Sequence, residues 1–537
     1  MTVDEDELQK IMEAAERDQK TAETDGLLRV GKIKLPKELP TFDEEFYEWK
    51  RQYWAKRIEK DGIKNIVAPM VDQSELAFRM FMRRHNGHLF FTPMIHARLF
   101  VESYAYRKTA ISSVPEDRPL IVQFCANDPD IFLDACRLVE GFCDGVDLNL
   151  GCPQMVARRG RYGSFLQEQP ELIAKMVSKV HKHCRLPLSV KIRVLEDLQS
   201  TINYAKIIEN AGASMLTVHG RIREQRGTNT GLANWDKIRE VCNVIKIPVV
   251  ANGNVQMPGD VERCMEETGA IAVMSAEGLL SNPVLFEGRI RPGYELAEEY
   301  LDLAEKYKAD KSSIRAHCYR FCHYSMVDNP EMRTRFGHAS TIDDFRNCLK
   351  DIRATFEEQA KDNEDGLKFL DGTETSLMEQ VQKMPAYFAK PYVRPPKRQA
   401  DEPLTEHRAK RRMEMEKIQA ETGLSFKKIR KRQKRKLAAV RVKKEKHVYP
   451  ACKRCNQPAG KDCEHDSCKK CCRGTCIHEN KTCKAHKLTE AIIAPKYEKY
   501  LKHQAENAKA EGKPNSQEPD KDPMDKIEEP LDDKVAG

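Results

Sequence analysis

Reactive and polar side chains follow short apolar runs within Asn65–Glu287 of the 537-residue chain. Cys152 comes shortly after one run, Lys191 lies near the end of another, and His219 directly follows a third. Because a thiol has an unperturbed pKa of about 8.5, Cys152 is mostly protonated at neutral pH and can deliver a proton. A lysine and a histidine that face one cavity suit an electron-rich ring such as a reduced flavin. The residue types therefore indicate redox chemistry coupled to proton delivery.

The other runs also end in groups that can bind a ligand. The whole set of run-end residues is Pro69, Met70, Gln123, Asn149, Cys152, Lys191, His219, Asn252, Gly253, Asn254, Glu277 and Gly278. Glycine-bearing turns follow the last two runs, and each opens a helix. In parallel α/β barrels such turns form the usual phosphate cradle, because free backbone N–H groups and helix dipoles converge there. The sequence therefore predicts a phosphate-bearing ligand.

The apolar runs alternate with amphipathic stretches at intervals of roughly thirty residues, as βα units do. The predicted strands are Asn65–Ala68, Leu89–Thr92, Leu120–Phe124, Gly145–Asn149, Leu188–Ile192, Met215–Val218, Val249–Ala251 and Ala270–Met274. The helices predicted between them are Glu75–Arg84, Asp130–Val139, Glu171–His183, Ile202–Asn210, Asp236–Val241 and Pro258–Glu267. Strict alternation over about 220 residues favours a (β/α)8 TIM barrel. An open Rossmann sheet fits less well, since its glycine fingerprint is missing after the first strand.

Composition divides the chain further. We expect an N-terminal extension at 1–60, a catalytic barrel at 61–292, a helical domain at 293–390, a basic arm at 391–448, a Cys/His module at 449–488 and a disordered tail at 489–537. The predicted helices of the helical domain include Glu298–Ala309, Ile314–Tyr324 and Ile342–Ala360. The tail from Glu506 onward holds ten acidic residues against five lysines, which is typical of a disordered segment.

Charge and hydrophobicity restrict the class of protein. Residues are 40% hydrophobic and 32% charged, and no run of about eighteen apolar residues exists, which argues against a membrane-spanning protein. The first 26 residues are acidic and polar, unlike a secretory signal, so we expect the cytoplasm, the nucleus or both. Residues 394–447 hold 20 basic against 7 acidic side chains, whereas the whole chain carries only +8. One strongly basic arm on an acidic body indicates a polyanion partner.

Cysteines cluster near the C-terminus, with 8 of the 18 between Cys452 and Cys483. In a reducing compartment such a cluster indicates metal ligands and not disulfides. Two Cys-x2-Cys pairs have zinc-ribbon-like spacing, and later residues supply a second possible quartet, so we expect one or two structural zinc ions. The predicted ligands are Cys452, Cys455, Cys468, Cys471, Cys472, Cys476, Cys483 and His486. Cys463, His465 and His478 remain alternative ligands, so the division into sites stays open.

Two strings in the predicted barrel carry a specific resemblance. DLNLGCPQ (Asp147–Gln154) and ARRGRYGSFL (Ala157–Leu166) resemble the active-site signature of the tRNA-dihydrouridine synthases. Further strings follow in that family's order, namely APMVDQS (Ala68–Ser74), VKIR (Val190–Arg193), TVHGR (Thr217–Arg221) and ANGNV (Ala251–Val255). REQRG (Arg223–Gly227) and PYVRP (Pro391–Pro395) resemble the eukaryotic group that acts on D-loop positions 16 and 17.

The resemblance implies an oxidoreductase that reduces uridine to 5,6-dihydrouridine in tRNA, with FMN as cofactor and NADPH as electron source. It implies that Cys152 donates a proton to uracil C5 and that Asn149 and Arg221 lie near the substrate. The residues implied to hold FMN are Pro69, Met70, Val71, Gln123, Lys191, His219, Asn252, Gly253, Asn254, Ala276 and Glu277. The expected partner is tRNA, with no membrane and no obligate protein partner.

Two other functions stay open from the sequence. An FMN-dependent pyrimidine oxidoreductase of the dihydroorotate type shares the barrel and cofactor, but a free pyrimidine requires neither a basic arm nor a zinc module. A non-catalytic RNA-binding barrel protein would not need Cys152, Lys191 and His219. The segment Lys427–Lys436 (KKIRKRQKRK) is predicted to bind the RNA backbone, to direct nuclear import, or both.

Overall fold

The computed structural model describes residues 26–327, 329–361, 379–381, 383–391, 406–423, 425, 429, 450–457, 459–460 and 462–510. Within the chain two compact units are distinguished, Met1–Arg398 and Gln399–Gly537. Most of the predicted basic arm, including Lys427–Lys436 except Ile429, lies outside the described residues. The first 25 residues and the acidic tail beyond 510 lie outside them as well.

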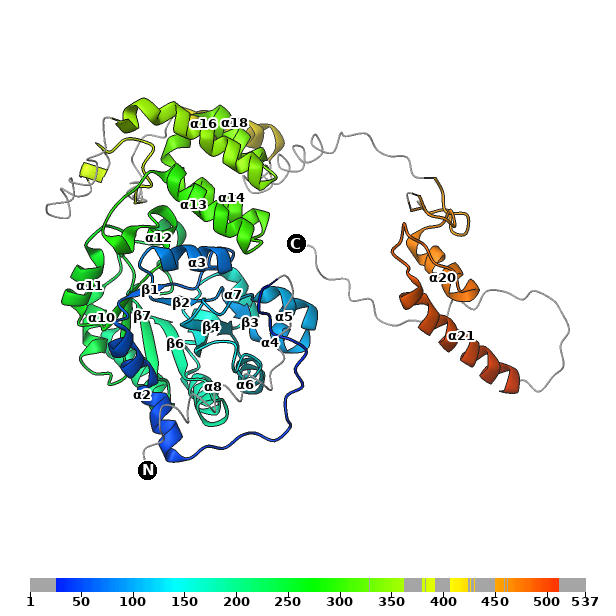
Figure 1. Cartoon of the computed structure of the whole chain (residues 1–537), viewed down its shortest axis with the longest axis horizontal. Helices are drawn as coiled ribbons and strands as arrows, with labels where there is room; N and C mark the ends of the chain where they lie inside the picture. The colour runs from blue at the N-terminus through cyan, green and yellow to red at the C-terminus, as the bar shows by residue number, and fades with distance from the viewer. Residues whose placement is uncertain are drawn as a thin grey trace. The chain divides into compact units, whose positions relative to one another are not determined.

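A closed barrel of eight parallel strands forms the centre of the first unit (Figure 1). Its strands are β1 (Asn65–Val67), β2 (Leu89–Phe91), β4 (Leu120–Cys125), β5 (Gly145–Leu150), β6 (Leu188–Arg193), β7 (Met215–His219), β8 (Val249–Asn252) and β9 (Ala272–Ser275). Phe90 and Phe91 of β2 pair with Leu120 and Ile121 of β4 and close the barrel. The predicted (β/α)8 barrel is thus confirmed. The additional β3 (Ile95–His96) pairs with the end of β4, and two residues are too few to give a periodic signal in the sequence.

Side chains alternate between the two faces of each strand, and this sorts the barrel into an outer and an inner set. Val146, Leu148 and Leu150 of β5 belong to the large core beneath the surrounding helices. The intervening positions point into the barrel. At the N-terminal ends of the strands they are apolar, as with Ile121 and Met215, which belong to a separate inner cluster. Toward the C-terminal ends they become polar, so one end of the barrel interior is dry and the other carries the chemistry.

Helices surround the barrel as the sequence predicts. They are α3 (Leu76–Arg84), α6 (Pro129–Arg137), α8 (Pro170–His183), α9 (Leu198–Asn210), α10 (Trp235–Cys242) and α11 (Asp260–Thr268), with the short α4 (Ala97–Glu102), α5 (Tyr104–Ala110), α7 (Met155–Gly160) and α12 (Glu277–Ser281) added. Helix α9 begins four residues earlier than predicted, because the Asp197 carboxylate accepts from the Ser200 N–H at 2.6 Å and caps the first turn.

The helix α2 (Glu44–Asp61) closes the N-terminal end of the barrel. Its Trp54 is fully buried among the inner apolar residues, and a Cβ placed on Gly145 would lie only 2.7 Å from the indole. The Lys50 ammonium donates to the carbonyls of His181 at 2.7 Å and Cys184 at 2.5 Å, where α8 ends. Cationic groups stabilise helix C-termini, so this residue fixes α2 to the barrel wall.

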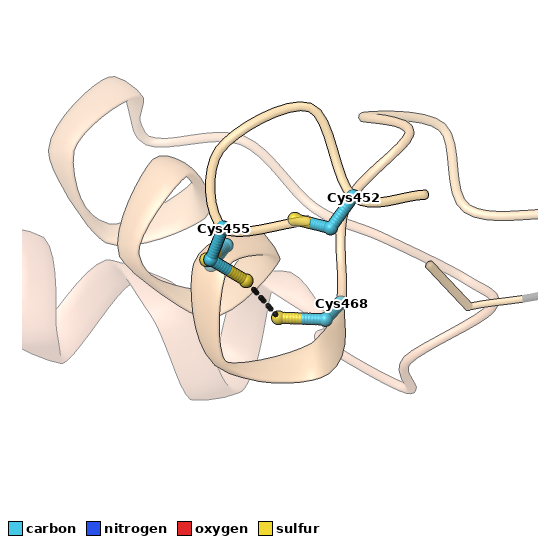
Figure 2. A group of neighbouring side chains, drawn as sticks. Cys452, Cys455 and Cys468 are labelled. Carbon is cyan, nitrogen blue, oxygen red and sulfur yellow. Dashed lines mark hydrogen bonds between the residues drawn. The ribbon is translucent and has the colours of Figure 1, made fainter. Parts of the chain in front are cut away.

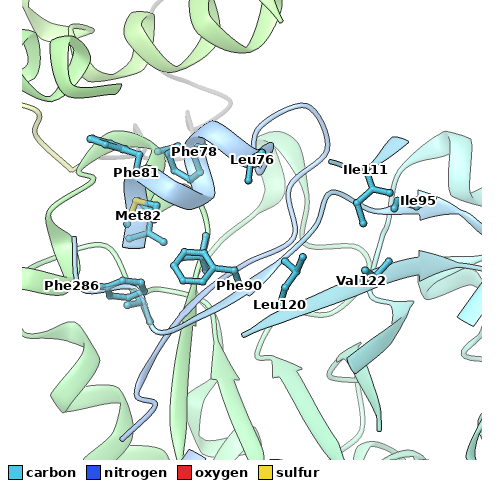
Figure 3. Packing of buried hydrophobic residues seen from close by; sticks show 14 of the residues in the cluster. Leu76, Phe78, Phe81, Met82, Phe90, Ile95, Ile111, Leu120, Val122 and Phe286 are labelled. Atoms are coloured by element: carbon cyan, nitrogen blue, oxygen red, sulfur yellow. The ribbon is translucent and has the colours of Figure 1, made fainter. Parts of the chain in front are cut away.

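In the same unit the barrel is followed by α13 (Gly293–Lys306), α14 (Lys311–Phe321), α15 (Pro330–His338) and α16 (Ile342–Lys361), among the residues that the structure describes. Their apolar faces join the core that lies outside the barrel strands. Figure 3 shows part of this core, with Phe78, Phe81 and Met82 of α3 packed over Phe90 of β2. The helical region and the barrel therefore share one hydrophobic core.

Glu75, at the start of α3, joins the barrel to this helical region. Its carboxylate accepts from the Tyr300 hydroxyl at 2.7 Å and contacts Nε2 of His317 at 3.1 Å. The His317 ring stacks on Phe78 with centroids 4.4 Å apart. Burial alone would raise the pKa of the Glu75 carboxyl, but the charge of His317 and the hydrogen bonds from His317 and Tyr300 outweigh it, so the pKa is lowered.

We expect Glu75→Ala to lower the free energy of unfolding by about 3 kcal/mol at neutral pH, because it leaves the polar groups of Tyr300 and His317 without their partner. The loss should shrink as pH falls below 4.5, because the carboxyl of the unfolded wild-type chain then binds a proton while the folded carboxyl, with its lowered pKa, still resists protonation. Urea unfolding followed by tryptophan fluorescence measures both effects.

The matched control is Glu298→Ala, which removes a partly exposed ion pair with Arg353 on α16. Exposed pairs contribute about 1 kcal/mol or less. An equal loss in both variants would contradict the assigned role of Glu75.

The second unit contains α18 (Glu406–Thr422), α20 (Lys469–Glu479) and α21 (Glu490–Ala510) among its described residues. The prediction of a disordered tail from residue 489 was wrong for residues 490–510, because Ile493 in the first turn of α21 packs in the small core of this unit. Buried cysteines of and around α20 pack with Leu488 and Ile493 into a small core. Among the described residues of either unit, no helix is both long and apolar enough to cross a membrane.

Candidate active site

A chain of hydrogen bonds crosses three neighbouring strands inside the polar end of the barrel. The Asp147 carboxylate on β5 accepts from Ser189 Oγ of β6 at 2.7 Å and from Gln123 Nε2 of β4 at 2.8 Å. The Gln123 amide oxygen accepts in turn from Asn149 Nδ2 at 2.8 Å. The strand register places these residues together, since Gln123 pairs with Asp147 and Asp147 pairs with Ser189. These hydrogen bonds therefore fix the orientation of the Gln123 and Asn149 side-chain amides.

This chain of bonds ends on the turn that carries Cys152. The Asn149 amide oxygen accepts from the backbone N–H groups of Gly151 at 3.2 Å and Cys152 at 3.0 Å. On the other side, the backbone N–H and hydroxyl of Ser164 donate to the Cys152 carbonyl at 3.1 and 3.0 Å. Gly163 has φ +65°, and a Cβ there would lie 2.8 Å from the Cys152 oxygen, so a glycine is required. The Cys152 backbone is thus held from both sides.

The environment of Cys152 keeps its thiol protonated. Burial raises the pKa of the Cys152 thiol, and a hydrogen bond from the Gln154 N–H and the charge of Arg193 oppose this only in part. Arg193 itself is held by the carbonyls of Gly151 at 2.9 Å and Ile222 at 2.8 Å. At neutral pH the side chain of Cys152 therefore carries its proton, and it remains partly exposed.

Lys191 lies in the same layer on β6, one strand from Asn149. Burial lowers the pKa of Lys191 to about 7, with Arg193 contributing and Asp147 opposing. Its Nζ donates to the Asn252 amide oxygen at 2.8 Å, and Asn252 Nδ2 donates to the Met274 carbonyl at 2.8 Å. Because a nearby anion favours the protonated amine, an anionic ligand here would raise the pKa of Lys191 again.

His219 and Arg221 continue the polar layer after β7. The Arg221 guanidinium contacts His219 Nε2 at 3.2 Å and donates to the Asn254 amide oxygen at 2.7 Å. Since a guanidinium can only donate, the Nε2 atom of His219 accepts and the imidazole is neutral in this arrangement. Gly253 has φ +111°, and a Cβ there would lie 2.7 Å from Ala233 and 3.0 Å from the His219 ring. The predicted phosphate turn therefore packs directly against His219.

A cavity of about 300 Å³ opens at this end of the barrel. Of the sequence-predicted residues, it is lined by His219, Arg221, Asn252, Gly253, Asn254, Ala276 and Glu277. Lys191 reaches it through Asn252, whereas Gln123 and Asn149 lie buried behind the Cys152 turn. Pro69, Met70 and Val71 form the loop after β1 and do not line this cavity, and the side chain of Val71 is largely exposed.

The structure also brings to the cavity several residues that the sequence did not assign to cofactor or substrate. Pro153, Gln154, Arg193, Gln225 and Arg226 also line it. Their only signal in the sequence was membership of the quoted strings. With arginines, amides and a neutral imidazole around a volume at the lower end of the range for ligand pockets, the donor set fits an anionic, phosphate-bearing cofactor.

The predicted metal ligands gather in the second unit. Donor atoms of Cys452, Cys455, Cys468 and Cys471 lie within 4.8 Å of one another, and Figure 2 shows three of these side chains converging. A further group with the same spacing contains Cys463, Cys472, Cys483 and His486. The structure thus brings Cys463, which the sequence left as an alternative, next to three of the predicted ligands. Cys476 is grouped instead with His465 and Cys472.

Comparison with known proteins identifies the family of this chain. The sequence profile of the family "Dihydrouridine synthase (Dus)" matches residues 66–383, which is more than half of the chain. The chain belongs to the dihydrouridine synthase family. Family membership agrees with the resemblance carried by the strings around Cys152 and with the closed barrel.

Relatives match over most of their length. A mouse protein named "tRNA-dihydrouridine(16/17) synthase [NAD(P)(+)]-like" is 39% identical over 454 residues, covering 84% of this chain and 92% of the mouse protein. The Saccharomyces cerevisiae "tRNA-dihydrouridine(16/17) synthase [NAD(P)(+)]" is 46% identical over 285 residues, or 50% of this chain and 67% of the yeast protein. A Schizosaccharomyces pombe protein of the same name is 39% identical over 354 residues, which cover 62% of this chain and 88% of the S. pombe protein.

The buried carboxylate of Asp147 generates a testable pH dependence. Burial raises the pKa of Asp147 to about 6, although Ser189, Gln123 and Lys191 partly oppose it. The folded protein therefore binds this proton more tightly than the unfolded chain, and its unfolding free energy falls as pH rises from about 4 to 6. Asp147→Asn should remove this pH dependence. Between pH 4 and 6 the unfolding free energy of the variant should therefore rise relative to that of the wild type, by roughly 3 kcal/mol at most.

Asparagine fits the site, because its oxygen can accept from Gln123 while its amide donates to Ser189, whose hydroxyl already lies 3.4 Å from the Val146 carbonyl. Tryptophan fluorescence during urea unfolding reports on the barrel unit, which contains all three tryptophans. Asp236→Asn, which alters an exposed carboxylate, should follow the wild-type curve. Parallel curves for wild type and Asp147→Asn would rule out the raised pKa.

Proposed function

We propose that this protein reduces uridine to 5,6-dihydrouridine in tRNA, at D-loop positions 16 and 17, with FMN as cofactor and NADPH as electron source. The observation that carries the proposal is a protonated Cys152 thiol, fixed on its turn beside a cavity lined with cationic and amide donors. The names of the similar mouse and yeast proteins support tRNA as the substrate in preference to a free pyrimidine.

The residues around the cavity suit FMN. We assign Asn252, Gly253, Asn254, Ala276 and Glu277 to the phosphate end, because they line the cavity where the turns after β8 and β9 meet. From the family resemblance we assign Lys191, His219 and Gln123 to the polar edge of the ring, although of these only His219 lines the cavity. We assign the loop Pro69–Val71, which lies outside the cavity, to the face of the ring. When bound and reduced, FMN supplies the hydride that is added to C6 of uracil.

Cys152 completes the reduction from the other side of the base. Hydride addition at C6 leaves negative charge on the uracil, which is relieved when C5 receives a proton. The S–H bond of Cys152 breaks and a C5–H bond forms, leaving a thiolate that Arg193 stabilises through its positive charge. Asn149 aligns the thiol by holding the N–H groups of its turn. From the family resemblance we place Asn149, through this turn, and Arg221, which lines the cavity, near the uracil.

Access to the cavity requires the base to leave the RNA stack. Extrusion of a nucleotide costs on the order of a few kcal/mol, and loop uridines reduce that cost because they are poorly stacked. The positive side chains of Arg193, Arg221 and Arg226 at the cavity favour a phosphate-rich partner. We infer that the basic arm adds backbone contacts, that zinc holds the Cys/His module together, and that the protein works in the cytoplasm, the nucleus or both.

Cys152→Ala should retain bound FMN and NADPH oxidation but make dihydrouridine at least about a hundred-fold more slowly, because only the proton for C5 is lost. The measurements are flavin absorbance per chain, NADPH consumption without tRNA, and single-turnover dihydrouridine formation. The matched control is Cys125→Ala, which removes a neighbouring buried thiol whose pKa burial raises to about 12. A wild-type rate in Cys152→Ala would exclude Cys152 as the acid.

Changing the eight basic residues within Lys427–Lys436 to glutamine should weaken tRNA binding uniformly across tRNA species. If about six of them contact phosphates, the slope of log K against log salt should flatten substantially, at roughly 0.7 to 0.9 per contact. The uridine that is reduced should not change. In the control variant, Lys513, Lys521, Lys526 and Lys534 of the acidic tail are changed to glutamine, which should leave the salt dependence of binding unchanged. An unchanged slope in the arm variant would assign the arm to localisation or to another partner.

A further inference from the structure

Two adjacent cysteines on helix α20 belong to different clusters of possible metal ligands. Cys471 and Cys472 lie in its first turn, after Cys468 at the N-cap. Successive residues on an α-helix are rotated by about 100°, so neighbouring side chains leave the helix on different sides. Cys471 faces the group containing Cys452 and Cys455, whereas Cys472 faces the group containing Cys463. One helical turn therefore supplies ligands to two separate clusters.

The first cluster has the geometry of a tetrahedral thiolate site. It consists of Cys452, Cys455, Cys468 and Cys471, and the sulfurs of Cys455 and Cys468 are 3.5 Å apart (Figure 2). A tetrahedral zinc with Zn–S bonds of about 2.3 Å separates its sulfurs by about 3.8 Å. The turn that follows Cys452 is closed on itself, since the Asn456 N–H donates to the Cys452 carbonyl at 3.0 Å.

The second cluster is more deeply buried and contains a histidine. The Cys483 sulfur lies 4.0 Å from that of Cys463 and 3.6 Å from Nδ1 of His486. Cys463, Cys472 and Cys483 are all buried, and Cys483 is tied to Leu488 by two backbone hydrogen bonds of 2.9 Å. Four donors of borderline-soft character at this spacing match a three-thiolate, one-imidazole zinc site.

Cys476 is the competitor for the second site. It lies one turn after Cys472 on α20, with the two sulfurs 3.9 Å apart. Its sulfur is nevertheless absent from the four-donor group and gathers only with Cys472 and His465. Nε2 of His465 lies 3.2 Å from the Thr482 carbonyl, and the group that His465 forms with Cys472 and Cys476 has only three donors, one fewer than a closed structural zinc site needs. Cys476 packs in the small core of this unit, which is sufficient to explain its burial.

We infer that this unit binds two Zn²⁺ ions in interlocked sites, one held by Cys452, Cys455, Cys468 and Cys471 and the other by Cys463, Cys472, Cys483 and His486. The inference rests on the zinc binding proposed above and specifies its number and ligands. The sites are interlocked because Cys463 of the second site lies in the chain between the two ligand pairs of the first. Organising the first site also positions Cys463 and Cys472 of the second, so metal binding and folding of the unit are coupled.

The full-length protein tests the inference by metal analysis. We expect two zinc ions per chain by elemental analysis and by native mass spectrometry after gentle exchange. X-ray absorption at the zinc edge should fit seven sulfur donors to one nitrogen donor over the two ions, with distances of about 2.3 and 2.0 Å. The exposed Cys455 should make the first site the more accessible one, so a chelator should remove the two ions in two phases.

Single substitutions decide the partition of ligands. Cys463→Ser and Cys455→Ser should each retain at most one zinc per chain, whereas Cys476→Ser and His465→Gln should retain two. Cys476→Ser is the matched control for Cys463→Ser, since both remove a buried sulfur from the same small core. Dihydrouridine formation, followed in parallel, tests the catalytic proposal independently of the metal count.

Each other result has a defined meaning. One zinc per chain in the wild type, or two in Cys463→Ser, would overturn the two-site assignment while leaving zinc binding intact. One zinc in Cys476→Ser together with two in Cys463→Ser would assign Cys476 as the ligand in place of Cys463. Iron instead of zinc, or no metal at all under reducing, metal-replete preparation, would overturn both the inference and the zinc proposal.

Discussion

A carboxylate buried inside a closed barrel needs hydrogen-bond donors from its neighbours, and the rest of the site depends on which residues donate to Asp147. Ser189 and Gln123 donate to its two oxygens, which fixes the direction of the Gln123 amide. That direction determines how Asn149 must face, and Asn149 then holds the turn of Cys152. The position of the reactive thiol is thereby set by a charge that never contacts it.

The barrel supports this arrangement by separating its interior into layers. Trp54 and apolar strand residues fill the end next to α2, so water is excluded from beneath the polar layer. Burial within the barrel lowers the pKa of Lys191, whereas burial against Cys125, Ala157 and Tyr162 raises the pKa of the Cys152 thiol. The same physical effect, loss of hydration, thus gives a lysine that can lose its proton and a thiol that keeps its own.

Loops and neighbouring helices hold the Cys152 turn in place and link the barrel to the helical region. Gly163 and Ser164 support the Cys152 turn from behind, and Arg193 ties it to the loop after β7. At α3, Glu75 links the barrel to the helical region through Tyr300 and His317. These contacts join segments that are far apart in sequence, and they make the site a property of the whole first unit.

The sequence by itself determined the barrel, because runs buried on both faces must be apolar and β-branched, and such runs are visible in a linear pattern. It also determined that Cys152, Lys191 and His219 would lie at one end, since the carboxyl ends of parallel strands meet there. Only the tertiary structure decided which side chains touch. The chain from Ser189 through Asp147 and Gln123 depends on strand register, and the choice of Cys463 over Cys476 depends on the direction in which a helix presents its residues. Neither register nor rotation is encoded in the spacing of residue types, because both are fixed by packing across segments that are distant in the sequence.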